Sequence, residues 1–155
     1  MYTTNLKQIN LPQPPHSIIE QVLVTANQII DGTIDGKDQK QWLAQLPTSQ
    51  MTPANDIVQE WGKKNIGPNF FWMVHVIHGS CPMHKDAVTI GKLNYIVATG
   101  GDNVLTGFYD DDKQFIESVR CELNTWYQIN AQVYHDVANV DPGVKRIILA
   151  ARTIP

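Results

Sequence analysis

After Gly67-Pro68 the chain consists of short β-branched and aromatic segments separated by turn residues, and this pattern limits the folds open to it. Segments of this length with Gly, Asp, Asn and Pro between them are typical of antiparallel strands rather than of alternating β-α units. The pattern therefore predicts a β-sandwich or jelly roll. Strands are expected at residues 70–77, 88–99, 104–109, 115–119, 127–133 and 146–153.

The residues before Gly67 carry a different pattern. The first fifteen are polar and contain three prolines, which predicts an extended arm. Ser17 followed by Glu20 is a capping-box pattern, so a helix is expected to begin there and to end before Gly32. Pro53 suits the first turn of a later helix. Helices are therefore expected at residues 17–30, 38–46 and 52–64, covering one outer face of the sheets.

Composition narrows the class of protein. The chain has 155 residues, of which 43% are hydrophobic and 17% charged, so it can bury one sizeable core and is not a disordered tail. We expect a single domain over residues 1–155, with an arm and supporting helices at 1–66 and a jelly-roll core at 67–155. The predicted fold class is mainly β with N-terminal helices (α+β), a double-stranded β-helix or cupin-like jelly roll.

Charge and cysteine content exclude several functions. A formal net charge of -3 argues against a module that binds nucleic acid through phosphate contacts. Two cysteines are too few for a disulfide framework or a four-thiolate zinc site. The sequence has no apolar run long enough for a membrane span and no signal-peptide core near its start, so we expect a cytoplasmic protein without a membrane partner.

His84 and Asp86 are separated by one residue. Positions i and i+2 of a strand project from the same face, so an imidazole and a carboxylate at this spacing can converge on one point. A His-x-Asp sequence also arises by chance, as two solvated groups beside a turn. His135 is the third candidate, because it follows the strand expected at 127–133.

Arg146 opens the last apolar strand. A guanidinium at the mouth of a β-rich core is costly to bury unless an anion pairs with it, and a ligand carboxylate suits its fork geometry. The alternatives are that Arg146 reaches solvent or pairs with Asp141. Strand alternation sends Lys145 and Arg146 to opposite faces, so only one of them can serve such a site.

Together these residues resemble the iron(II)- and 2-oxoglutarate-dependent dioxygenases, whose pattern is His-x-Asp, a distal His and a later Arg or Lys. The pattern is present here as His84-Lys85-Asp86, His135 and Arg146. Residues 93–97 and 106–109 also resemble core strands of that family. The resemblance covers roughly residues 70–153 and leaves the helical first half unassigned.

The resemblance implies that His84, Asp86 and His135 hold Fe(II), or another divalent metal in a purified sample. Two imidazoles and one carboxylate on one face of an iron leave three positions open for a 2-oxo acid and dioxygen. The implied reaction is oxidative decarboxylation of 2-oxoglutarate to succinate and CO2, coupled to hydroxylation of a substrate. No catalytic residue beyond the metal ligands is implied.

For 2-oxoglutarate, the resemblance implies that Arg146 binds the distal carboxylate, with Asn94 and Tyr109 as further candidates for contact. Two alternatives remain open. One is a cupin-like metal-binding protein that does not use 2-oxoglutarate, although cupins usually carry His-x-His and a Glu where this chain has Asp86. The other is a non-catalytic β-sandwich binding module in which the histidines are incidental.

The remaining histidines have other expected roles. His75 and His78 are three residues apart and therefore on opposite faces of one strand, where each is expected to support the core or a pocket wall. A zinc site of one of them with His84 and Cys81 is a further alternative, but it lacks a second thiolate nearby. His16 is expected at the surface. The expected partner is a small-molecule or peptide substrate, and an exposed sheet edge is compatible with a homodimer.

Overall fold

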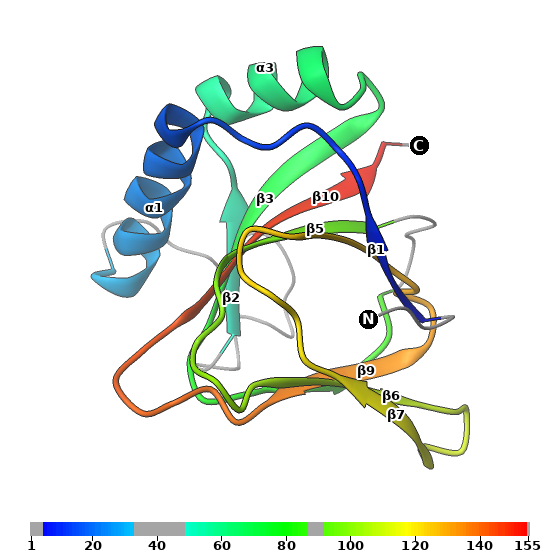
Figure 1. Cartoon of the computed structure of the whole chain (residues 1–155). Helices are drawn as coiled ribbons and strands as arrows, with labels where there is room; N and C mark the ends of the chain where they lie inside the picture. The colour runs from blue at the N-terminus through cyan, green and yellow to red at the C-terminus, as the bar shows by residue number, and fades with distance from the viewer. Residues whose placement is uncertain (1–4, 33–48, 87–91, 155) are drawn as a thin grey trace.

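The computed structural model describes residues 5–32, 49–86 and 92–154. Within these ranges the chain forms helices along its first half and antiparallel strands throughout (Figure 1). No helix among the described residues is long and apolar enough to cross a membrane. The elements are β1 (Leu6–Ile9), α1 (His16–Ile30), β2 (Ser49–Pro53), α3 (Asp56–Asn65), β3 (Phe70–Ile77), β4 (Cys81–His84), β5 (Lys92–Ala98), β6 (Leu105–Tyr109), β7 (Phe115–Val119), β8 (Trp126–Ile129), β9 (Tyr134–Ala138) and β10 (Arg146–Thr153).

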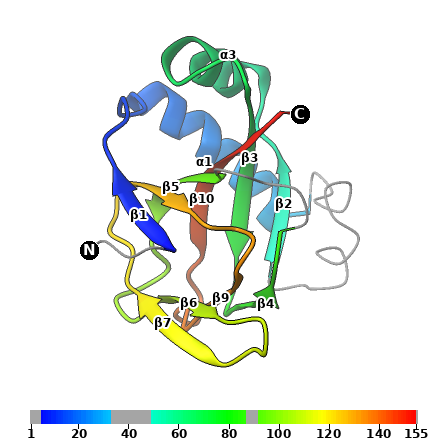
Figure 2. The same cartoon turned by 90° about the vertical axis from the view of Figure 1, so that its right-hand side faces the viewer.

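The strands form two antiparallel sheets that face each other. The larger has the order β1-β8-β5-β10-β3-β2 and the smaller has the order β4-β9-β6-β7. From β3 to β10 the chain passes repeatedly between the two sheets, which is the winding of a jelly roll. The fold is therefore the expected double-stranded β-helix of cupin type, with β1 and β2 added at the edges of the larger sheet. Figure 2 shows the helices and the smaller sheet on opposite sides of the larger one.

Alternate residues of the larger sheet belong to two different cores. On β3, Trp72, Val74 and Val76 pack with α1 and α3, whereas Met73 and Ile77 belong to the cluster between the sheets. Successive strand residues point to opposite faces, so a strand buried on both sides needs apolar residues at almost every position. The same alternation turns His75 toward the barrel interior. The helix-facing cluster comprises Ile18, Val22, Ala26, Ile29, Ala54, Val58, Trp72, Val74, Val76, Leu93, Tyr95, Trp126, Ile147, Leu149 and Ala151.

Helix α3 begins four residues later than expected. The side chain of Asn55 accepts a hydrogen bond of 3.1 Å from the backbone N–H of Val58 and so caps the helix. Ser49–Pro53 is instead the edge strand β2, where Pro53 is tolerated at the strand end. Gly62 then allows close packing of the helix, because a Cβ there would overlap the indole of Trp72.

The start of α1 also differs from the expectation. The helix begins at His16, its N-cap is Pro15, and no side chain caps it, so the Ser17–Glu20 capping box is wrong. The imidazole of His16 lies 2.9 Å from the Glu20 carboxylate instead. The expected extended arm contains the strand β1, which pairs with β8. The helix expected at 38–46 lies outside the described residues.

Candidate metal centre

His84 and His135 lie directly opposite each other on neighbouring strands of the smaller sheet. They are register partners in the antiparallel β4–β9 pair, and their ring centroids are 4.4 Å apart. Asp86 follows the end of β4, where its backbone N–H donates a 2.8 Å hydrogen bond to the carbonyl of Ala131. Strand pairing therefore brings together three side chains that are up to 51 residues apart in sequence, counted from 84 to 135.

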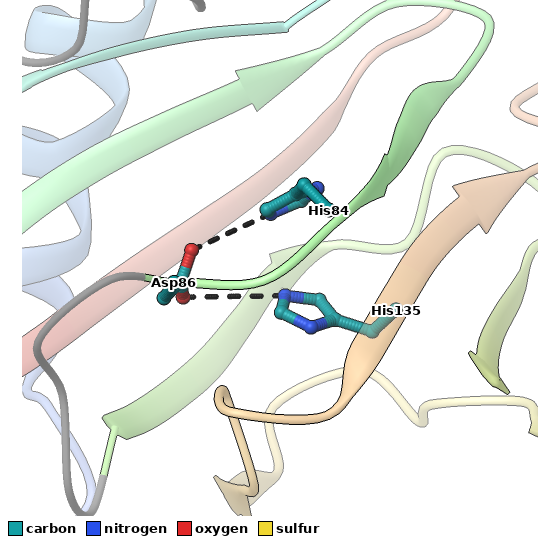
Figure 3. A group of neighbouring side chains, drawn as sticks. All are labelled: His84, Asp86 and His135. Atoms are coloured by element: carbon teal, nitrogen blue, oxygen red, sulfur yellow. Dashed lines mark ion pairs between the residues drawn. The ribbon is translucent and has the colours of Figure 1, made fainter. Parts of the chain in front are cut away.

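The three side chains converge as a metal site requires. Their nearest donor atoms lie within 4.8 Å of one another. The Nε2 of His84 is 3.5 Å from Asp86 Oδ1, and the Nε2 of His135 is 4.0 Å from Asp86 Oδ2 (Figure 3). The side chains are between 6% and 16% exposed. The structure thus brings together all the metal ligands that the sequence suggested.

Backbone carbonyls orient both imidazoles. The Nδ1 of His84 lies 2.6 Å from the carbonyl of Pro82, and the Nδ1 of His135 lies 2.8 Å from that of Val133. A carbonyl only accepts hydrogen bonds, so each Nδ1 must carry the proton and donate it. Nε2 is then the nitrogen left to bind a metal, and outer contacts of this kind hold ligand rings in place in metalloproteins.

The three groups differ in protonation in the metal-free protein. Burial favours the neutral form of Asp86, but Lys92, His84 and His135 outweigh it and hold the pKa of Asp86 well below its usual range. Burial lowers the pKa of His84, but hydrogen bonds to Asp86 and Cys81 raise it overall to about 9. Burial and the charges of His84 and Lys92 lower the pKa of His135 to about 4. A metal ion must therefore displace a proton from His84 at neutral pH.

The two imidazoles open into a cavity between the sheets. Strand alternation supplies its polar lining, because Lys92, Asn94 and Ile96 share the inward face of β5 while Leu93 and Tyr95 face the helices. The free space at its centre is about 30 Å³, which is room for about two waters. Its polar and charged lining residues are His75, His84, Lys92, Asn94, Thr106, Tyr127, His135 and Arg146.

Arg146 is buried in this cavity, with 2% of its surface exposed. Its Nη1 donates a 3.4 Å hydrogen bond to the carbonyl of Thr99, and its buried Nε has no partner. No carboxylate of the described residues lies within ion-pair distance of the guanidinium. The structure thus contradicts both alternatives, exposure to solvent and pairing with Asp141. Lys145 lines a separate surface hollow, as strand alternation predicts.

The two further candidates for 2-oxoglutarate contact lie in different places. Asn94 lines the cavity, and its buried Oδ1 has no hydrogen-bond partner. Tyr109 is not among the cavity residues, and its hydroxyl donates a 2.9 Å hydrogen bond to Asp136 Oδ2. Alternation along β6 explains the difference, because the buried Thr106 and Phe108 occupy the opposite strand face.

Sequence reasoning missed one charged residue of the site and left another without a definite role. Lys92 is the charged residue, and its spacing of two residues from Asn94 is the sequence signal for a shared strand face. His75 forms part of the cavity wall, one of its two expected roles, and its Nε2 lies 2.7 Å from the buried Ser49 hydroxyl. Burial and the nearby Lys92 lower the pKa of His75 to about 3. His78 is exposed on the other side of the sheet.

Comparison with known proteins establishes the fold alone. No protein-family model matches the sequence, and no curated protein matches it significantly. A prolyl-4-hydroxylase from Pseudomonas putida superimposes with a TM-score of 0.59, covering 98% of this chain and 94% of that chain at 12% identity. The nickel complex of the non-haem monooxygenase ThoJ has a TM-score of 0.52 and 12% identity over 97% of this chain and 73% of that chain.

A third similar structure is AviO1 from Streptomyces viridochromogenes, with a TM-score of 0.52 and 11% identity over 97% of this chain and 90% of that chain. The structures similar to this chain therefore include a hydroxylase and a monooxygenase built on the same barrel. Folds of this kind carry many functions, so activity must be argued from the site.

Proposed function

We propose that the protein is an iron(II)- and 2-oxoglutarate-dependent oxygenase that hydroxylates a small molecule or a peptide side chain. One observation carries the proposal. The two imidazoles of the His-Asp-His cluster and a buried arginine without an anionic partner line the same cavity inside the barrel. The cluster suits a divalent metal, and the arginine suits a carboxylate, so the pair fits a metal-chelating diacid.

The donor set fits Fe(II). His84 and His135 present Nε2, and the ionised Asp86 presents a carboxylate oxygen between them. This is the two-histidine, one-carboxylate set of non-haem iron oxygenases. When bound, iron with 2-oxoglutarate and dioxygen would supply the oxidising chemistry, and the protein's own residues position the reactants and exclude water.

Arg146 and Asn94 fit the cosubstrate. The guanidinium is fully buried and would form two parallel hydrogen bonds with a terminal carboxylate. Asn94 lines the same cavity, where the N–H groups of its amide are the ones able to donate to a carboxylate. Burying a cation without an anion is costly, which favours a ligand that carries the missing charge.

A second candidate is a cupin-like metal-binding protein that does not use 2-oxoglutarate. The cavity volume of about 30 Å³ favours it, because that space holds a metal ion and water but is too small for 2-oxoglutarate. Under the leading proposal, side chains must move when the cosubstrate enters. Lys92 is the group that would move first, since its long side chain is tethered by one ion pair to Asp86.

The two candidates differ in what an anaerobic titration shows. With Fe(II) bound, 2-oxoglutarate should raise the melting temperature and produce a visible charge-transfer band. Arg146→Met should weaken 2-oxoglutarate binding and leave metal affinity unchanged. Lys145→Met is the matched control, because that neighbour faces away from the cavity. Metal binding with no response to 2-oxoglutarate would favour the cupin-like protein and end the leading proposal.

A further inference from the structure

We propose that Lys92 binds the carboxylate of 2-oxoglutarate that lies next to the keto group, so that the cosubstrate is held by a cation at each end. Lys92 would hold the metal-chelating end and Arg146 the distal end. The inference rests on the proposed function and assigns a ligand role to a residue outside the metal cluster.

Lys92 is built into the cavity rather than exposed on a loop. It is the first residue of β5 and shares the inward strand face with Asn94. Its side chain is 13% exposed, and its ammonium lies 3.0 Å from Asp86 Oδ2. Lysine is seldom buried to this extent unless an anion accompanies it.

Metal binding changes the surroundings of this ammonium. Among the described residues, Asp86 is the one carboxylate within ion-pair distance of Lys92. The same Oδ2 also faces Nε2 of His135, so a metal held by the cluster takes up the charge on which Lys92 depends. The cavity would then contain a dication, Lys92 and Arg146 against one carboxylate, and buried charges without counter-ions are unfavourable.

A dicarboxylate supplies the missing charges at the right places. The register of β10 with β5 places Arg146 near Ala98 and Thr99, at the opposite end of β5 from Lys92. The two long side chains therefore reach the cavity from opposite ends. Because Lys92 pairs with a metal ligand, its anion should be the carboxylate that chelates the metal, and Arg146 is left with the distal one.

Two 2-oxo acids, 2-oxoglutarate and 2-oxobutyrate, distinguish binding of the carboxylate next to the keto group from binding of the distal carboxylate. 2-Oxobutyrate keeps the keto acid of 2-oxoglutarate and lacks the distal carboxylate. We would measure the affinity of both acids for the zinc-loaded protein by calorimetry, because zinc binds the same kinds of ligand without redox chemistry. The variants are Lys92→Met, Lys92→Arg and Arg146→Met, with Lys145→Met as control, and metal content and melting temperature are recorded for each.

The inference predicts a distinct result for each variant. Lys92→Met should lower the affinity of the protein for both acids by about tenfold or more, because one charge-assisted hydrogen bond is lost. Arg146→Met should lower the affinity for 2-oxoglutarate and leave the affinity for 2-oxobutyrate unchanged. Lys92→Arg should keep most of the affinity for both acids, because it preserves the charge. Lys92→Met should bind metal at least as tightly as the wild type, because a cation beside the metal has been removed.

Contradicting results are equally distinct. If Lys92→Met binds 2-oxoglutarate as tightly as the wild type does, Lys92 only neutralises Asp86 in the metal-free protein, and the inference is wrong while the proposed function stands. If Lys92→Met lowers the affinity for 2-oxoglutarate but not for 2-oxobutyrate, Lys92 binds the distal carboxylate and the assignment is overturned. If the loaded wild type binds neither acid, the proposed function itself fails.

Discussion

The two faces of the larger sheet are made by the same strands and differ in chemistry: the helix-facing side is apolar, whereas the inward side carries polar groups among its apolar residues. On β3 and β10, residues such as Trp72, Val74 and Leu149 face the helices and are fully buried apolar side chains. His75, next to Val74, and Arg146, three residues before Leu149, face the barrel interior instead. Strand alternation thus confines the polar groups of these strands to the inward face.

This contrast explains how so short a chain can carry a polar site. The helix-facing side supplies hydrophobic stabilisation of about 1.5–3 kcal/mol for each fully buried large side chain. The barrel interior can then hold a buried arginine without an anion on the larger sheet and, from the smaller sheet, two imidazoles against a carboxylate. The account predicts that substitutions on the two faces have separable effects.

The largest effect is expected at the metal cluster. Asp86→Ala should lower metal affinity by more than about 100-fold, because even an outer hydrogen-bond partner of a ligand accounts for about 10- to 100-fold. Competition titration with Co(II) measures it. His78→Ala is the matched control, since His78 is exposed on the helix side of the sheet. An Asp86→Ala protein that binds Co(II) as the wild type does would remove the metal site from the account.

The helix-facing side should respond in stability alone. Leu149→Ala removes a side chain with 0% exposure and should lower the free energy of unfolding by about 2–5 kcal/mol, through lost burial and a cavity. Urea unfolding measures the loss, and the folded variant should bind one metal ion like the wild type. If Leu149→Ala lowers the free energy of unfolding by less than about 1 kcal/mol, or if the folded variant no longer binds metal, the effects of the two faces are not separable.

The interior side should make the metal-free protein sensitive to acid. The folded pKa values of His75 and His135, about 3 and about 4, lie below the ordinary value of 6.5. Between these folded values and pH 6.5 the unfolded chain binds more protons than the folded protein does. The free energy of unfolding therefore falls as the pH is lowered from 6.5. Each group contributes up to about 1.4 kcal/mol per pH unit in this window.

Urea unfolding between pH 4 and 6.5 tests this slope. His75→Asn should reduce it, because one of the two depressed groups is gone. His84 has the opposite effect at higher pH. Its folded pKa of about 9 lies above the ordinary value of 6.5, so the stability that its protonation adds is lost as the pH rises from 6.5 through 9. An unchanged slope in His75→Asn would mean that His75 titrates normally in the folded protein.

The smallest effect is expected from Arg146→Met without ligand. Replacing a buried unpaired cation by an apolar side chain of similar length is often neutral or stabilising. We expect the free energy of unfolding to stay within about 1 kcal/mol of the wild type or to rise. Chemical unfolding beside Leu149→Ala measures the contrast. A loss of stability as large as that of Leu149→Ala would show that Arg146 stabilises the ligand-free barrel and does not need a bound anion to be buried there.

The sequence predicted the parts of the fold that carry long, regular patterns. The strands β3, β7 and β10 have the expected bounds, because their aromatic and β-branched runs end at clear turn residues. The strands β1, β2, β4 and β9, of four or five residues, are not predicted, whereas the equally short β7 is, because Asp110-Asp111-Asp112 marks a turn before it. The strand β4 contains Pro82, and its register with β9 shifts between Cys81 and His84.

The site was predictable where local spacing decides it. The His84-x-Asp86 spacing and the resemblance of the segment at His135 to the oxygenase family indicate all three residues without knowledge of the barrel. Lys92 was missed because only the strand register shows that its side chain reaches the same cavity. Tyr109 was placed there by resemblance, but its strand face points it to Asp136.

The most direct test of the account is a crystal structure of the protein grown anaerobically with Fe(II) and 2-oxoglutarate. The account predicts a metal about 2.0–2.2 Å from Nε2 of both His84 and His135 and from a carboxylate oxygen of Asp86. It also predicts the distal carboxylate of 2-oxoglutarate on the Arg146 guanidinium. A metal held by other residues, or a diacid bound outside the barrel with the cavity still closed, would contradict it.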